Sequence, residues 1–138
     1  MKIAFNSIKH INIGGGIEKY TYELGSRLVE RGHEVVVYSM QHYDKVQREC
    51  NGMRIVGVPV IPLSATERLM ASAWGAIHTL LMREKPDVIH FHTAASAYFA
   101  RMTRLRNIPS LLQMHGLDWQ RSRWGKGSTK MLKYFERV

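Results

Sequence analysis

Short apolar runs alternate along the chain with longer stretches in which apolar residues recur every three or four positions. The short runs predict strands at residues 2–6, 34–40, 54–60, 88–92 and 110–115. The longer stretches predict helices at residues 17–31, 64–84, 94–105 and 126–138. Alternation of strands and helices favours parallel strands joined by right-handed crossovers. We therefore expect an α/β fold, a parallel sheet with helices on both faces.

The size and composition of the chain indicate one domain. The sequence has 138 residues, and 45% of them are apolar, which is enough for a buried core. The single cysteine, Cys50, excludes a disulfide framework and a cysteine-rich zinc site. No apolar run is long enough to cross a bilayer, and the first residues lack a signal-peptide pattern. We expect a single cytoplasmic domain over residues 1–138.

The charge is unevenly distributed. The net charge is +9, and residues 101–138 hold nine Lys or Arg against two Asp or Glu. A basic region suits an anionic membrane, a phosphorylated substrate or nucleic acid, or it is simply a solvated face. Nucleic acid is not expected, because the sequence shows neither a recognition-helix pattern nor interleaved aromatic and basic residues.

The helix predicted at residues 64–84 carries bulky apolar side chains, namely Leu69, Met70, Trp74 and Ile77. Its polar face lacks the lysine and arginine content of a helix that lies on a membrane. We therefore expect these side chains to pack into the core. A peripheral membrane contact, if the protein makes one, would use the basic residues 101–138 instead.

Three consecutive glycines at positions 14–16 lie between the first strand and the first helix. In a doubly wound sheet, ligands bind beyond the carboxyl ends of the strands, where this loop lies. Glycines let the backbone approach a ligand, and the free amides of a helix start favour an anion such as phosphate. The alternative is a tight turn that needs one glycine with positive φ.

The glycine loop does not match two common nucleotide-binding motifs. Lys19 occupies the position where a dinucleotide fingerprint requires its third glycine, and the second strand ends without an acidic residue. The Gly-Lys-Ser/Thr sequence of a nucleotide triphosphatase is also absent. Both a dinucleotide dehydrogenase and an ATPase are therefore disfavoured.

Polar residues follow the fourth and fifth predicted strands. His90, His92 and Thr93 lie at the end of one, and His115 lies at the end of the other. Alternation places His90 and His92 on one face of their strand. A metal site is not expected, because no carboxylate–histidine cluster lies nearby in the sequence. A single histidine at a strand end is often structural, but histidines at two such ends, on the side of the glycine loop, favour a functional site.

Three segments occur in a fixed order over nearly the whole chain: GGGIEKYTYELGSRLVERGHEVVVYS, KPDVIHFHT and LLQMHGLDWQRSRWG. Together they resemble the N-terminal domain of retaining GT-B glycosyltransferases of family four, the group 1 type. The last segment is similar to a bacterial subgroup that builds polysaccharides. The resemblance implies a Rossmann-like sheet, the N-terminal half of a GT-B fold. It also implies transfer of a sugar, with retention, from a nucleotide-sugar to a glycan or a lipid-linked saccharide.

The resemblance implies roles for individual residues. Gly15 and Gly16 would lie against the donor diphosphate, and His115 would be the catalytic residue that meets the transferred sugar. Residues at the acceptor or the sugar would be Glu18, His92, Thr93, Trp119 and Arg123. Glu18 could instead order the loop, and Trp119 could instead pack on the domain. No cofactor and no catalytic metal are expected, because the nucleotide-sugar is a substrate and N–H dipoles stabilise the departing diphosphate.

The resemblance covers the first of the two domains of such enzymes. The C-terminal domain, which holds most of the nucleotide-sugar, is missing from residues 1–138. We expect a truncated, acceptor-side domain that is inactive alone and that binds the missing half or a second copy. Its expected place is the cytoplasm, with peripheral contact at the inner face of the plasma membrane. The alternatives are a non-catalytic Rossmann-like module that binds a phosphate-bearing ligand or a protein, and a basic membrane- or nucleic-acid-binding domain.

Overall fold

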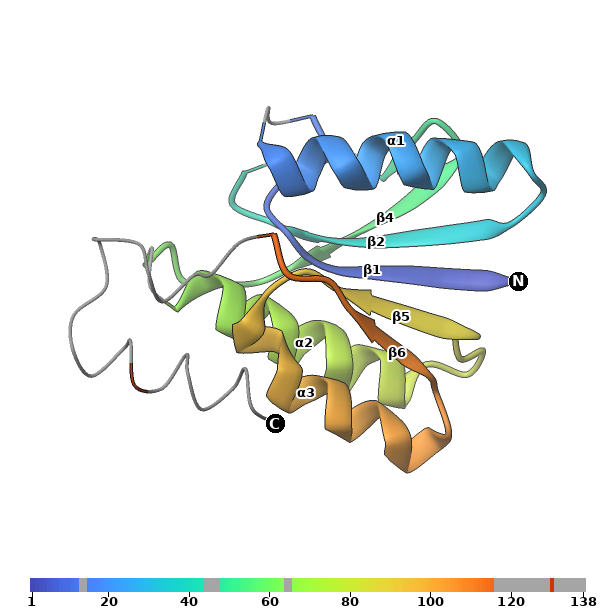
Figure 1. The fold of residues 1–138 in the computed structure, drawn as a ribbon. Helices are drawn as coiled ribbons and strands as arrows, with labels where there is room; N and C mark the ends of the chain where they lie inside the picture. The colour runs from blue at the N-terminus through green and yellow to red at the C-terminus, as the bar shows by residue number, and fades with distance from the viewer. Residues whose placement is uncertain (13–14, 44–47, 64–65, 116–129, 131–138) are drawn as a thin grey trace.

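A computed structural model describes residues 1–12, 15–43, 48–63, 66–115 and 130 (Figure 1). The strands are β1 Lys2–Ile8, β2 Glu34–Met40, β3 Glu49–Cys50, β4 Met53–Val58, β5 Val88–Phe91 and β6 Ser110–Leu112. The α-helices are α1 Gly16–Glu30, α2 Glu67–Leu81 and α3 Ala97–Met102, and the 3₁₀ turns η1 Ala94–Ser96 and η2 Thr103–Arg106 flank α3. Apart from Lys130, the helix predicted at 126–138 lies outside the described residues.

The described strands form one sheet in the order β3-β4-β2-β1-β5-β6. Every neighbouring pair is parallel except β3 and β4. Helix α1 covers one face of the sheet, and α2 and α3 cover the other (Figure 1). The predicted α/β class and the doubly wound arrangement are therefore confirmed. After β1 the chain adds β2, β3 and β4 on one side of it and then crosses to the other side to add β5 and β6. The boundary between β1 and β5 is therefore the topological switch point of the sheet.

The antiparallel pair at the sheet edge was not predicted. Strand β3 precedes β4 in a hairpin in which Glu49 pairs with Arg54 and Cys50 with Met53. The two residues between them, Asn51 and Gly52, have φ angles of 47° and 75°. Positive φ at both central positions is what a two-residue hairpin turn requires, and Asn-Gly is its strongest sequence signal. The expectation of a purely parallel sheet is wrong at this edge.

Two apolar clusters lie on the two faces of the sheet. Val35 and Val37 of β2 are buried in the cluster beneath α1, together with Phe5. Val36 and Tyr38, the intervening residues, belong to the other cluster, beneath α2. Strand side chains alternate between faces, so a strand covered on both sides must be apolar at nearly every position. This explains why β1 and β2 read as continuous apolar runs in the sequence.

Helix α2 does not bury the side chains that its sequence pattern suggested. Trp74 and Ile77 are 43% and 41% exposed, and together with Met70 and Ala73 they line a shallow apolar groove. The buried residues of the helix are mainly small: Glu67, Ala71, Ser72, Gly75, Ala76 and Thr79. The helix therefore lies close to β1, where bulky side chains have no room, and the expectation that Trp74 and Ile77 pack into the core is wrong.

Helix α1 agrees closely with its prediction. It was expected at residues 17–31 and spans Gly16–Glu30. Gly32 follows with a φ of +83°, as a glycine that ends a helix commonly does. In the described part of the chain, no helix has the length and apolar character needed to cross a membrane.

Candidate functional site

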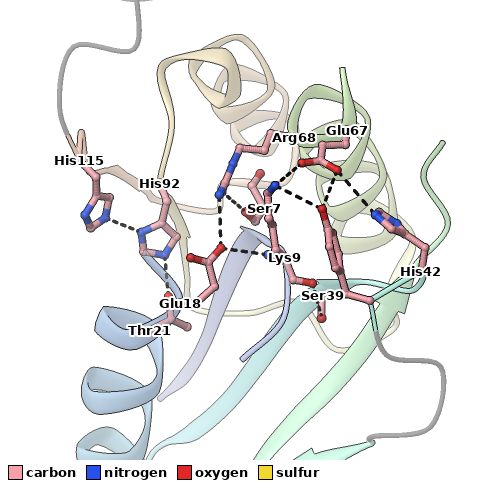
Figure 2. Close-up of polar contacts among 11 residues, drawn as sticks. Ser7, Lys9, Glu18, Thr21, Ser39, His42, Glu67, Arg68, His92 and His115 are labelled. Atoms are coloured by element: carbon pink, nitrogen blue, oxygen red, sulfur yellow. Dashed lines mark hydrogen bonds and ion pairs between the residues drawn. The ribbon is translucent and has the colours of Figure 1, made fainter. Parts of the chain in front are cut away.

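Polar side chains from five elements meet at the carboxyl ends of β1, β5 and β6 (Figure 2). They come from the segment after β1, the first turns of α1 and α2, and the segments after β5 and β6. The meeting point is the topological switch point of the sheet. This is where open α/β sheets bind their ligands, so we take these residues as the candidate site.

A row of rings joins the start of α1 to the end of β6. His92 Nδ1 lies 3.1 Å from His115 Nε2, and His92 Nε2 lies 3.4 Å from the Thr21 hydroxyl. The rings of His90 and His92 are 4.4 Å apart between centroids, so the two do share one strand face. Tyr20 of α1 contacts His115 edge-on at 5.3 Å. The structure thus brings together the helix after the glycine loop and the histidine after β6, which lie far apart in the sequence.

Burial keeps two of these histidines neutral. His92 is 1% exposed and His90 is 4% exposed. Burial lowers the pKa of His92 to about 2, with smaller contributions from His90, His115 and Arg68. Burial also lowers the pKa of His90. A proton therefore adds to either ring more readily in the unfolded chain than in the folded one.

We expect this difference to make the fold acid-sensitive. Below the unfolded histidine pKa of about 6.5, the unfolded chain binds protons that His92 in the fold does not, so stability falls as the pH falls. The loss for His92 alone is about 2 kcal/mol between pH 7 and pH 5. Urea unfolding at several pH values measures it. His92→Asn, which cannot titrate, should show a shallower pH slope, and an unchanged slope would contradict this assignment.

Glu18 and Arg68 form a partly buried ion pair between the first turns of α1 and α2. Arg68 Nη2 lies 3.3 Å from Glu18 Oε1, and the Glu18 side chain is only 5% exposed. Glu18 Oε1 also accepts a hydrogen bond from the amide of Lys9 at 3.4 Å. Arg68 Nη1 donates to the carbonyl of Ser7 at 3.0 Å. The pair therefore ties the segment after β1 to both helices.

A second charged group lies beside this pair (Figure 2). Lys9 Nζ is 2.6 Å from Glu67 Oε1, and Tyr43 donates to Glu67 Oε2 at 3.2 Å. Partial burial by itself lowers the pKa of Lys9, but the hydrogen bonds to Glu67 and Tyr43 outweigh it and raise that pKa. His42 Nε2 lies 3.6 Å from Glu67. Glu67 thus holds the segments after β1 and β2 against the start of α2.

A buried hydroxyl cluster fills the space between β1, α2 and β5. Its members are Ser7, Ser72, Thr93 and Ser96. Ser7 Oγ contacts Ser72 Oγ, which lies 2.7 Å from Ser96 Oγ, and Thr93 Oγ1 lies 2.8 Å from Ser96 Oγ. Ser7 has a φ of 67°, at a register shift of β1 against β2. The positive φ at Ser7 accompanies this register shift, after which Ile8 still pairs with Ser39 at the end of β1.

The two described glycines of the loop differ in what surrounds them. Gly15, the N-cap of α1, has extended backbone angles of −127° and 162°, so its conformation does not require glycine. A Cβ there would collide with the Glu18 carboxylate. At Gly16 a Cβ would meet no described atom within 4 Å apart from its chain neighbours and the backbone of its own helix. Contacts among the described residues explain the glycine at Gly15, but they leave open space beside Gly16, where a ligand could approach the helix start.

The other predicted site residues divide into two groups. His92 and Thr93 are nearly inaccessible, at 1% and 4% exposed, and their polar atoms bond within the protein. Trp119 and Arg123 lie outside the described residues, as do the first glycine of the loop and the neighbouring Arg121 and Trp124. Within the described residues, no group of three or more His, Cys, Asp or Glu could hold a metal ion.

Comparison with known proteins identifies the family. The model of Glycosyltransferase Family 4 matches residues 14–138, which is most of the chain. The chain belongs to this family. The match begins in the glycine loop and includes β5, His92 and His115, so it contains most of the candidate site, while β1 with Ser7, followed by Lys9, precedes it.

Two similar proteins are subunits of an N-acetylglucosaminyltransferase. A phosphatidylinositol N-acetylglucosaminyltransferase GPI3 subunit of Saccharomyces cerevisiae is 32% identical over 88 residues, covering 61% of this chain and 20% of its own length. The gpi3 subunit of the enzyme with the same name from Schizosaccharomyces pombe is 28% identical over 86 residues, covering 59% of this chain and 19% of its own length. The chain thus spans about a fifth of the length of these relatives.

Two solved structures share the fold of this chain. Sucrose-phosphate synthase from Thermosynechococcus elongatus matches with a TM-score of 0.65 at 16% identity, covering 96% of this chain and 39% of that one. The glycotransferase of kitacinnamycin matches with a TM-score of 0.53 at 20% identity, covering 82% and 30%. In both cases this chain corresponds to less than half of the other protein, and the likeness is one of fold.

Proposed function

We propose that the chain is the acceptor-side, N-terminal domain of a retaining glycosyltransferase that moves a sugar from a nucleotide-sugar to an acceptor. The observation that carries the proposal is the meeting of the first turns of α1 with His115 at the switch point of the sheet, through the Tyr20 ring and the Thr21–His92 contact. The space that the described residues leave beside Gly16 supports it. The chain spans about a fifth of its named relatives, so we propose that it needs a second domain for turnover.

The helix start provides the chemistry for a departing diphosphate. The first amides of α1 have no acceptors within the helix and lie at the positive end of its dipole. Amides that point at developing negative charge stabilise it without reorganisation. His115 would meet the transferred sugar through a hydroxyl group. Departure of the nucleoside diphosphate from the sugar through an oxocarbenium-like state needs no metal in this scheme, and no cofactor is proposed.

Burial changes the proposed roles of three residues. Glu18 is paired with Arg68 and the Lys9 amide, so we propose that it orders the loop. His92 and Thr93 would support the site from beneath instead of touching the acceptor, because both are nearly inaccessible. Trp119 and Arg123 remain proposed contacts with the acceptor or the sugar.

The names of the relatives favour a lipid acceptor. The name phosphatidylinositol N-acetylglucosaminyltransferase includes a lipid, and the two matched chains are named as subunits of that enzyme. We propose a lipid-linked acceptor over a free glycan, with peripheral contact at the inner face of the plasma membrane and with partner chains. Membership of a bacterial polysaccharide-building subgroup stays a prediction. Sedimentation with anionic lipid vesicles tests the membrane contact. If the chain does not sediment with the vesicles, the proposed membrane contact is wrong.

Binding of nucleoside diphosphates tests the proposed function. UDP and GDP, titrated against the chain by NMR, should bind weakly and shift amide signals of Gly16 and His115. Gly16→Val should weaken binding at least about tenfold, which is about 1.4 kcal/mol, because its side chain occupies the open space beside the helix start. His115→Ala should weaken binding of the corresponding nucleotide-sugars more than that of the nucleoside diphosphates.

A matched control lies at the other end of the sheet. His33 precedes β2 and hydrogen-bonds the N-terminus, so His33→Ala should leave nucleotide binding unchanged. If neither diphosphate nor nucleotide-sugar binding responds to His115→Ala and Gly16→Val, the sugar-transfer proposal is wrong. A protein that co-purifies with the chain in that case would favour the alternative, a non-catalytic module with a protein partner.

A further inference from the structure

Three side chains from three separate segments form one line of hydrogen bonds (Figure 2). Thr21 lies in α1, His92 follows β5, and His115 follows β6. The Thr21 hydroxyl lies 3.4 Å from His92 Nε2, and His92 Nδ1 lies 3.1 Å from His115 Nε2. Each of the two contacts is a hydrogen bond with a single hydrogen. Because a neutral imidazole has only one N–H, the nitrogen of His92 that accepts from or donates to Thr21 decides whether the other nitrogen donates to or accepts from His115.

The Thr21 hydroxyl decides the first contact. Thr21 is 0% exposed, so water cannot accept its proton. Among the described residues, His92 Nε2 is the hydrogen-bond partner of this hydroxyl. If His92 carried its proton on Nε2, the Thr21 hydrogen would be buried without an acceptor, and a buried polar group without a partner is strongly unfavourable. The hydroxyl therefore donates, and Nε2 accepts.

The state of His92 follows from that direction. Burial holds the ring in its neutral form, which has a single N–H. Because Nε2 accepts from Thr21, the proton of His92 must be on Nδ1. This N–H points at His115 Nε2, which must then be an acceptor. A neutral His115 with an accepting Nε2 carries its own proton on Nδ1.

We propose that Thr21 selects the tautomer of His92, and that His92 in turn selects the tautomer of His115, so that His115 always presents an N–H at Nδ1. His92 is then a positioning residue, and Thr21 acts one step further away. Whatever meets His115 Nδ1, protein or substrate, meets a donor instead of a lone pair. The consequence for catalysis rests on the proposed function, in which a sugar hydroxyl would accept from His115.

Imidazole nitrogen signals in NMR spectra test the tautomers directly. In long-range proton–nitrogen correlation spectra of the ¹⁵N-labelled chain at neutral pH, protonated and unprotonated ring nitrogens have clearly separated shifts. We expect Nδ1 protonated and Nε2 unprotonated in both His92 and His115, with the signals assigned through His92→Asn and His115→Asn. A protonated Nε2 in either ring of the wild-type chain would overturn the proposal.

The role of Thr21 needs a matched pair of variants. Thr21→Ser keeps the hydroxyl and should keep both tautomers. Thr21→Val has nearly the same shape but no hydroxyl, so the ring nitrogens of His92 and His115 should shift toward averaged values that report a mixture. If the folded Thr21→Val chain still shows a single tautomer of His92 and of His115, the proposal that Thr21 selects the tautomers is wrong. If that variant does not fold, the wild-type and Thr21→Ser spectra still decide the tautomers.

Ligand binding separates this inference from the function on which its consequence rests. The nitrogen spectra need no ligand, so they can succeed even where UDP and GDP fail to bind. If UDP-sugars bind, Thr21→Val should weaken them at least about threefold while Thr21→Ser does not. Equal binding by the two variants would remove the catalytic consequence and leave the tautomer assignment intact.

Discussion

Replacing Gly75 with alanine is expected to lower the free energy of unfolding by about 2–4 kcal/mol. Gly75 lies on the face of α2 that packs against β1, and a Cβ there would lie closer than 3.0 Å to the side-chain amide of Asn6. That amide cannot move away freely. It donates to the carbonyl of Ser72 at 3.3 Å and accepts from the amide of Ser7 at 2.7 Å, in a fully buried position.

Gly16→Ala is the matched control for Gly75→Ala. It adds the same methyl group to a helix, but at a position where the new Cβ would meet no described atom within 4 Å apart from its chain neighbours and its own helix backbone. Alanine favours helix more than glycine, so stability should stay level or rise by up to about 1 kcal/mol. Denaturant unfolding of both variants gives the comparison. If Gly75→Ala is as stable as the wild type, α2 does not lie close enough to β1 for a Cβ at this position to meet the Asn6 side chain.

Most of the secondary structure was predictable because the sheet is covered on both faces. Such strands must be apolar at almost every position, which makes β1, β2 and β5 visible as short apolar runs. The exception is β3, which is only two residues long and has no apolar run of its own. Its only sequence signal was the Asn51-Gly52 pair, which marks a hairpin even when a strand is too short to recognise.

The packing of α2 was not predictable from apolar periodicity. That method ranks positions by bulk and hydrophobicity, so it selected Trp74 and Ile77 for the core. The structure instead buries Ser72 and Gly75, because the helix lies close to the end of β1. How closely a helix approaches a sheet depends on both surfaces, and a pattern along one element contains no information about the other.

The site was predictable at its strand ends and not in its supporting residues. His92 comes directly after β5 and His115 comes three residues after β6, and the carboxyl ends of parallel strands are where functional groups gather. Lys9, Glu67 and Arg68 belong to no recognised motif. They meet only because the strand order places β1 between β2 and β5 and α2 begins above that point. Contacts of this kind depend on topology, which a sequence pattern does not specify pair by pair.

Replacing Arg68 with methionine is expected to lower the free energy of unfolding by about 2–4 kcal/mol. The change keeps the length and apolar stem of the side chain but removes the charge that faces Glu18. Glu18 would then be a buried carboxylate with the Lys9 amide as its remaining described donor. The Arg68 side chain is 24% exposed, so solvent can screen part of the loss, and we place the effect below the upper limit for a fully buried pair.

The variant Glu18→Gln separates the charge from the contact. Glutamine can still accept from the Lys9 amide, so Glu18→Gln should cost less than Arg68→Met, and the double variant should be more stable than Arg68→Met alone. A double variant that loses the sum of the two single effects would show that the pair is not coupled. In that event Arg68 would act only through its hydrogen bond to the carbonyl of Ser7.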